Sequence, residues 1–112
     1  MTSRSTQLRG LLSELEFELR ALHFWSIEPP AASALQSQTP FCCDTLLLQE
    51  WLQWVFIPRL AKLLDEGRSL PRNCNVHAYA TEALKGVELD IGNLLRIIET
   101  IDRLLSEQRR LH

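Results

Sequence analysis

The amino-acid sequence predicts an all-α fold, an antiparallel bundle of about four helices with the second helix kinked at Pro58. Two long segments carry leucine and isoleucine at helical spacing. Only four glycines and five prolines occur among 112 residues, which leaves room for long helices. The composition, 46% apolar and 23% charged, is that of an ordinary globular protein, and the length predicts a single domain over residues 1–112.

The first helix is predicted to start near Ser5 or Thr6 and to run to about His23. Phe17 points away from its apolar face, which is unusual for a solvent-facing position. The segment from Ser26 to Pro40 contains three prolines and is predicted to be a long loop. The apolar face of this helix consists of leucines spaced alternately by four and three residues: Leu8, Leu12, Leu15, Leu19 and Leu22.

The second helix is predicted to be capped by Asp44 or Thr45 and to end at Gly67. Pro58 lies well inside it, where proline removes one hydrogen bond and crowds the carbonyl four residues earlier, so a kink is expected. The apolar residues before and after this proline centre on opposite sides of the helix. The buried face is therefore predicted to change by about half a turn there.

A turn over Leu70–Asn75 precedes a short third helix, about Val76–Lys85. The fourth helix is predicted over about Glu88–Arg109. Its apolar stripe is Ile91, Leu94, Leu95, Ile98, Ile101 and Leu105.

Charge and hydropathy limit the classes of function. Fourteen acidic and twelve basic residues give a net charge of −2, and the bases are dispersed among acids. Nothing therefore favours direct nucleic-acid binding, which requires a basic face. The N-terminus lacks the apolar run of a signal peptide, and no segment approaches the length of a membrane span. A cytoplasmic protein with reduced cysteines is predicted.

No metal, cofactor or catalytic motif is predicted. Cys42, Cys43, Cys74 and His77 are the one conceivable zinc set, but adjacent cysteines rarely face the same metal. Glu-x-x-His, phosphate-binding loops and nucleophile motifs do not occur. We therefore expect no enzyme.

The alternative to a binding protein is a small-ligand-binding or enzymatic bundle. It requires Asp44, Glu50 and Arg59 to converge on a polar site around the kink.

Aromatic residues provide the main candidates for partner binding. Trp51 and Trp54 lie one helical turn apart, and the simpler interpretation places them in the core. The apolar surplus around them, which includes Val55, Phe17 and Trp25, favours a partner surface, because tryptophan is typical of binding hot spots. These five residues are the predicted partner contacts.

The same region carries a family resemblance. Pro40-Phe41, Asp44-Thr45 and the run from Glu50 to Arg59 resemble the signature of the YqcC-like family of small bacterial proteins. The resemblance covers nearly the whole chain, although the three cysteines are not part of the pattern. It implies an all-α domain of uncharacterised biochemistry, named in association with a tRNA pseudouridine synthase.

The resemblance also implies an accessory role. Pseudouridine synthases use a catalytic aspartate on a large β-rich domain, which this sequence lacks. An acidic helical protein is expected to contact the synthase rather than the tRNA. The overall prediction is a protein–protein interaction module whose partner is that synthase or a second copy of the chain.

Overall fold

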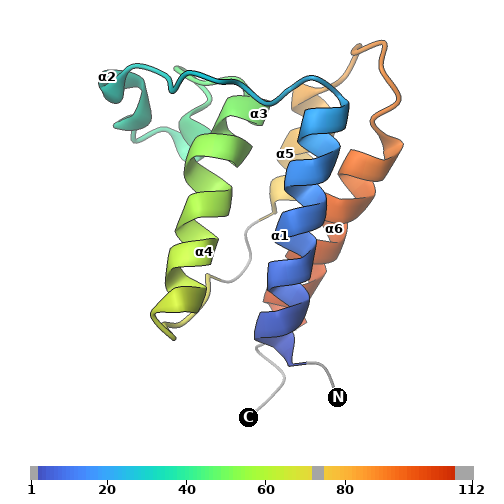
Figure 1. The fold of residues 1–112 in the computed structure, drawn as a ribbon. Coiled ribbons are helices and arrows are strands. Elements are labelled where there is room, and N and C mark those ends of the chain that lie inside the picture. Colours follow the sequence, from blue (N-terminus) through green and yellow to red (C-terminus); the bar gives the residue numbers. More distant parts are fainter. Residues whose placement is uncertain (1–2, 72–74, 108–112) are drawn as a thin grey trace.

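Every regular element is a helix in the part of the chain that the computed structural model describes, residues 3–71 and 75–107 (Figure 1). None of the helices in these ranges is both long and apolar enough to span a bilayer. The α-helices are, in chain order, α1 (Arg4–Ala21), α2 (Ala32–Leu35), α3 (Leu48–Trp51), α4 (Ile57–Asp65), α5 (Val76–Ala83) and α6 (Gly92–Glu107).

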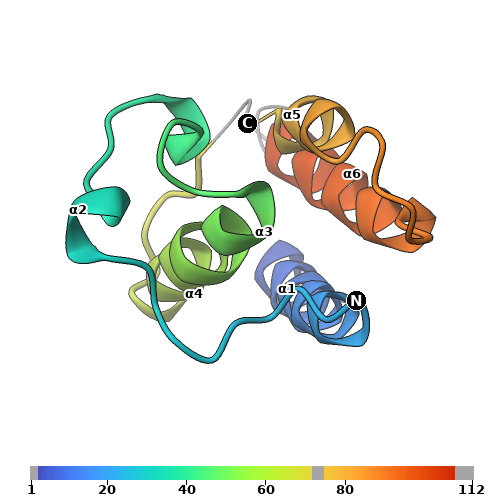
Figure 2. The same ribbon diagram turned by 90° about the horizontal axis from the view of Figure 1, so that it is seen from above.

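The long elements alternate in direction. Helix α1 runs one way, α3 and α4 return, α5 runs parallel to α1, and α6 returns again (Figure 1). The short helix α2 and a 3-10 turn, η1 (Pro40–Cys42), lie beside α3 at one end (Figures 1 and 2). The predicted all-α antiparallel bundle is therefore confirmed.

The core is densest where α1 packs along α6. Four of the five leucines of the predicted face of α1 are buried, whereas Leu22 is half-buried at the C-cap. Most members of the predicted stripe of α6 are also buried, because residues three and four apart share one side of a helix. Helix α6 starts at Gly92, later than predicted, and Arg109 lies outside the described residues. The buried residues of the pair are Leu8, Leu12, Leu15, Leu19, Leu94, Ile97, Ile98, Ile101, Leu104 and Leu105.

Helix α5 is capped from a distant part of the chain. Asn75 precedes it in a left-handed conformation, with φ at 51°, and makes no side-chain cap. Instead the Asp102 carboxylate of α6 accepts hydrogen bonds from the backbone N–H of Val76, at 3.2 Å, and of His77, at 2.7 Å. Burial raises the pKa of Asp102 above its usual range, although the two N–H donors oppose this shift.

The central helix is continuous from α3 through α4, and the disturbance predicted at Pro58 is present as a π-helical turn, η2 (Leu52–Phe56). The N–H of Ile57 bonds to the carbonyl of Leu52, five residues back. An i→i+5 turn accommodates one extra residue, which lets the helix continue past a proline that lacks an N–H.

The predicted change of buried face at Pro58 is wrong. Leu48, Leu52, Phe56 and Leu60 are all buried and are spaced by four residues across the proline. In a regular α-helix such a series drifts around the axis, but the wider π-helical turn keeps it on one side.

The predicted N-terminal caps of this helix are also wrong. The helix begins at Leu48, whose preceding residue, Leu47, donates its N–H to the Glu50 carboxylate at 2.8 Å. Asp44 instead accepts from the Ser37 hydroxyl, and the Thr45 hydroxyl donates to the Ala34 carbonyl of α2, so neither side chain is available to the helix end. The C-terminal end is as predicted, with Gly67 in the left-handed conformation at φ 64°.

Candidate functional site

A buried glutamine fixes the loop after α1 to the π-helical turn. Gln53 is 6% exposed, its Oε1 accepts from the N–H of Ser26 at 2.8 Å, and its Nε2 donates to the Ser26 carbonyl at 2.7 Å. The indole N–H of Trp54 donates to the Ser26 hydroxyl at 3.3 Å. We call the paired Gln53–Ser26 bonds the Gln53 clamp. They satisfy both backbone groups of one loop residue, as buried polar groups require.

Two of the five predicted partner contacts, Phe17 and Trp25, lie on α1 and this loop, and a third, Trp54, lies in η2 and bonds to the loop. Phe17 is 74% exposed, and it borders the same shallow surface hollow as Arg20. The Arg20 guanidinium lies 4.5 Å from the centre of the Trp25 ring, a cation–π contact. Trp25 in turn precedes Ser26, the residue bonded to Trp54. We use the name α1–loop face for these four residues, Phe17, Arg20, Trp25 and Trp54, together with the exposed Ile27 that follows Ser26 in the loop.

The other two predicted contacts lie elsewhere. Trp51 is 7% exposed and packs between Phe41, edge-on at 5.1 Å, and Phe56, stacked at 5.1 Å. The structure therefore places Trp51 in the core. Val55 is half-buried and borders, with Trp51, a cavity that Gln53 does not line.

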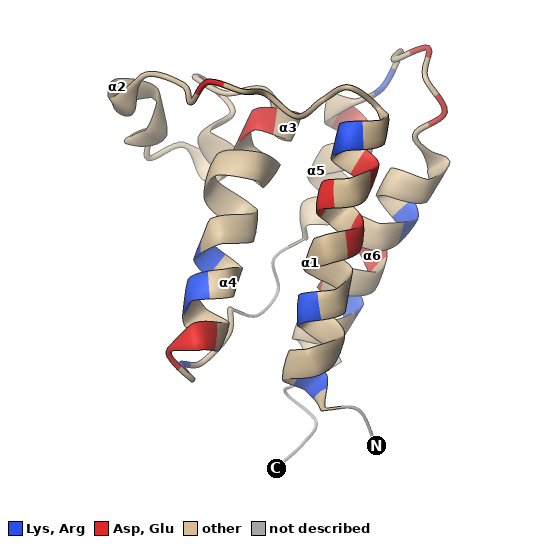
Figure 3. Ribbon diagram, in the orientation of Figure 1, with Lys and Arg blue, Asp and Glu red and all other residues tan. Residues whose placement is uncertain are grey.

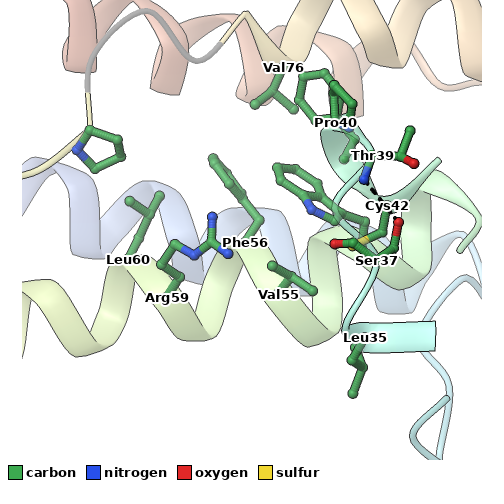
Figure 4. Close-up of a pocket in the computed structure, with 13 residues that line it drawn as sticks. Leu35, Ser37, Thr39, Pro40, Cys42, Val55, Phe56, Arg59, Leu60 and Val76 are labelled. Carbon is green, nitrogen blue, oxygen red and sulfur yellow. Dashed lines mark hydrogen bonds between the residues drawn. The ribbon is translucent and has the colours of Figure 1, made fainter. Parts of the chain in front are cut away.

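That cavity has a volume of about 310 Å³ and lies between η2, α4, the segment 35–42 and the start of α5 (Figure 4). Its innermost wall is nearly fully buried and mostly aromatic or branched, while the Arg59 side chain extends toward it from α4 (Figure 4). The lining residues are Leu35, Ser37, Thr39, Pro40, Phe41, Cys42, Trp51, Val55, Phe56, Arg59, Leu60, Pro71 and Val76.

Strained backbone forms one wall of the cavity. Phe41 and Cys42 are consecutive residues in the left-handed region, with φ of 59° and 50°, where residues other than glycine are unfavourable. The Phe41 ring stacks on Tyr79 at 4.5 Å and nearly parallel, and the Cys42 thiol is buried. Burial raises the pKa of the Tyr79 phenol. The ring contacts hold the strained turn in place.

The three residues of the predicted polar site, Asp44, Glu50 and Arg59, do not all line this cavity. Arg59 lines it, but neither Asp44 nor Glu50 does. Asp44 is exposed and accepts from the Ser37 hydroxyl at 2.5 Å, and this hydrogen bond lowers the pKa of its carboxyl. Glu50 caps the central helix.

The conceivable zinc set is only partly within the described ranges. Cys42 is buried, Cys43 is exposed, and Cys74 lies outside the described residues. Within the described ranges no three histidine, cysteine or acidic side chains come together in a group that could hold a metal ion.

Comparison with known proteins identifies the family. The model of the family described as "tRNA pseudouridine synthase C" (DUF446) matches residues 7–104. An uncharacterised protein of Haemophilus influenzae is 43% identical over 100 residues, covering 89% of this chain and 93% of that protein. The uncharacterised protein YqcC of Escherichia coli is 35% identical over 101 residues, covering 90% and 93%. This chain belongs to the YqcC-like family.

Two further matches concern the fold of the YqcC-like family and a longer relative. The solution NMR structure of YqcC from E. coli superposes with a TM-score of 0.83 at 33% identity, covering 95% of this chain and 91% of that one. A tRNA pseudouridine synthase C of Pectobacterium carotovorum is 46% identical over 71 residues, which is 63% of this chain but 19% of that protein. The YqcC-like segment thus accounts for about a fifth of that relative.

Sequence analysis of this YqcC-like chain missed the residues that organise the site. Gln53 stands out only as a polar interruption in an apolar run, and its partner is 27 residues away. Phe41 was recognised only as part of the family signature, and nothing local indicates its left-handed backbone. The available signal was a polar residue in the middle of an aromatic, apolar helical segment.

Proposed function

We propose that this domain is a cytoplasmic accessory module that binds a tRNA pseudouridine synthase through the α1–loop face. The observation behind the proposal is the match to the synthase C of P. carotovorum, in which the homologous segment is only 19% of the chain. A covalent link keeps two modules at high effective concentration. In this protein, a YqcC-like domain on its own chain would reach the same association by binding the synthase non-covalently.

The helical character of the domain supports a binding role. Helices are the only regular elements of the described ranges, whereas the family resemblance assigns pseudouridine chemistry to a β-rich enzyme domain. Both α1 and α4 carry acidic as well as basic residues (Figure 3). This mixture supports a protein partner rather than tRNA, which favours a continuous basic surface.

The α1–loop face has the composition of a binding hot spot. Phe17 and Ile27 are 74% and 96% exposed, so both present apolar area to a partner. Trp25 and Trp54 are half-buried and already oriented by Arg20 and Ser26. Rigid aromatic side chains lose little conformational freedom on binding, and tryptophan and arginine are enriched at such centres.

The test is a binding titration with the purified tRNA pseudouridine synthase C of the same organism, by calorimetry. We expect Phe17→Ser and Ile27→Ser each to weaken binding about tenfold, a loss of about 1.4 kcal/mol. Both positions are exposed, so the fold should be retained. Val87→Ser and Leu89→Ser, at 37% and 49% exposed positions in the α5–α6 loop, are matched controls and should bind as the unmodified chain does.

Two results would overturn the proposal. One is the absence of any complex at a concentration of about 50 μM of each protein. The other is light scattering that finds the chain alone to be a dimer which Phe17→Ser dissociates. The face would then be occupied by a second copy of the chain.

A further inference from the structure

We propose that the cavity beside η2 is a second site, which binds a small aromatic monocarboxylate. The ring would lie against Trp51, Phe56 and Val76, and the carboxylate would pair with Arg59. This site is separate from the α1–loop face and does not depend on the synthase.

The size and walls of the cavity favour a compact aromatic ligand. Its volume of about 310 Å³ is at the lower end of the range for small-molecule sites, roughly 300–1,000 Å³. Trp51, Phe56, Leu60 and Val76 are between 1% and 7% exposed, so the inner wall is almost entirely removed from bulk solvent. Such a wall favours a ring, which gains both apolar burial and contacts with the aromatic faces.

Arg59 gives the cavity its charge preference. In the described part of the chain Arg9, Arg20, Arg68 and Arg103 each pair with a carboxylate, whereas Arg4, Arg59 and Arg96 make no ion pair. Of these three, Arg59 is the one that lines the cavity. Its side chain extends toward the cavity beside Phe56 (Figure 4). A planar guanidinium can donate two parallel hydrogen bonds to one carboxylate, so it both orients and selects such a group.

The other polar groups of the cavity favour a single negative charge. The Ser37 hydroxyl donates to Asp44 at 2.5 Å and accepts from the Thr39 N–H at 3.1 Å. The Cys42 thiol points to the Ser37 carbonyl at 3.8 Å. These groups are already paired, and the Asp44 carboxylate repels anions at that end. One free guanidinium therefore matches a monocarboxylate better than a phosphate dianion.

The backbone around the cavity is preorganised. The π-helical turn and the two left-handed residues, Phe41 and Cys42, both border it. Such irregularities are uncommon, cost free energy, and concentrate at functional sites. The stacking of Phe41 on Tyr79 keeps this wall from collapsing into the empty volume.

The experiment is a titration of the ¹⁵N-labelled full chain with indole-3-acetate, followed by NMR. We expect saturable shifts at the amides of Val55, Phe56 and Val76, with a dissociation constant on the order of 1 mM or tighter. Indole-3-acetamide has the same ring without the charge and should bind at least about tenfold more weakly. Arg59→Gln should reduce indole-3-acetate binding to a similar degree.

Lys62→Gln is the matched control, because it removes one exposed positive charge from the same helix at a position that does not line the cavity. It should leave indole-3-acetate binding unchanged. The proposal fails if the neutral probe binds as well as the acid, if the Arg59 and Lys62 variants behave alike, or if no saturable shift is seen up to about 10 mM. The comparison of the two probes uses the unmodified chain and so does not depend on a variant folding.

Discussion

The α1–α6 pair and the aromatic region around η2 are stabilised in different ways. The pair is built from leucine and isoleucine that interlock on regular helices. The aromatic region is held by the Gln53 clamp, by ring contacts of Trp51 and Phe41, and by a strained turn. Regular packing leaves little to bind a partner, whereas the directional contacts of the second region hold open a cavity and orient exposed aromatic side chains.

The largest expected effect is a loss of unfolding free energy, and it should be greater in the α1–α6 pair than in the cavity wall. Leu15→Ala should lower the free energy of unfolding by about 2–5 kcal/mol, because Leu15 is fully buried and its neighbours relax only in part. Val55→Ala should cost about 1 kcal/mol, since Val55 already borders an open volume. Urea denaturation measures both. Equal losses would mean that the two regions are packed alike.

An intermediate effect is expected at the Gln53 clamp. Gln53→Leu leaves the N–H and the carbonyl of Ser26 without their partners, so we expect a loss of about 2 kcal/mol. Tryptophan fluorescence should change, because Trp25 and Trp54 flank the clamp, while far-ultraviolet circular dichroism should keep its helical amplitude. Gln49→Leu is the control, since this side chain makes no hydrogen bond in the described residues. A neutral Gln53→Leu would show that the aromatic region does not need the clamp.

The smallest expected effect is on how stability depends on pH. The contributions of Asp102 and Asp44 to the free energy of unfolding should change with pH in opposite directions. Burial raises the pKa of Asp102 above 3.8, so its contribution to stability is present below that pH and is lost as pH rises through the folded-state pKa. The Ser37 hydroxyl lowers the pKa of Asp44, so its contribution is present above pH 3.8 and is lost as pH falls.

As pH rises from below to above 3.8, Asp102→Asn should therefore gain stability relative to the unmodified chain, and Asp44→Asn should lose it. Urea denaturation at a series of pH values measures both differences. If the stabilities of the two variants, relative to the unmodified chain, change in the same direction with pH, this prediction is wrong.

The sequence predicted the packed pair well because its signal is periodic and local. Leu8 to Leu19 and Leu94 to Leu105 bury the faces that their spacing indicates. For the central helix the C-terminal end was predicted, but neither its start nor its buried face. Pro58 signals a disturbance, yet nothing in the residues around it specifies a π-helical turn rather than a bend.

The candidate site was predicted only in part because its organising contacts are non-local. Phe17, Trp25 and Trp54 were identified by residue type, but the link between them runs through Arg20 and Ser26. Asp44 has the chemistry of a helix cap, and only the folded loop shows that its partner is Ser37. Trp51 has the chemistry of a hot spot, and only the positions of Phe41 and Phe56 place it in the core.

The capping of α5 by Asp102 has a consequence for the order of folding. An eight-residue helix is too short to persist by itself, and the first turn of α5 receives its cap from α6, about 25 residues further along the chain. Helix α5 is synthesised before α6, so we expect it to become stable only after α6 has docked beside it. We therefore expect the last two helices to form and to open as one cooperative unit.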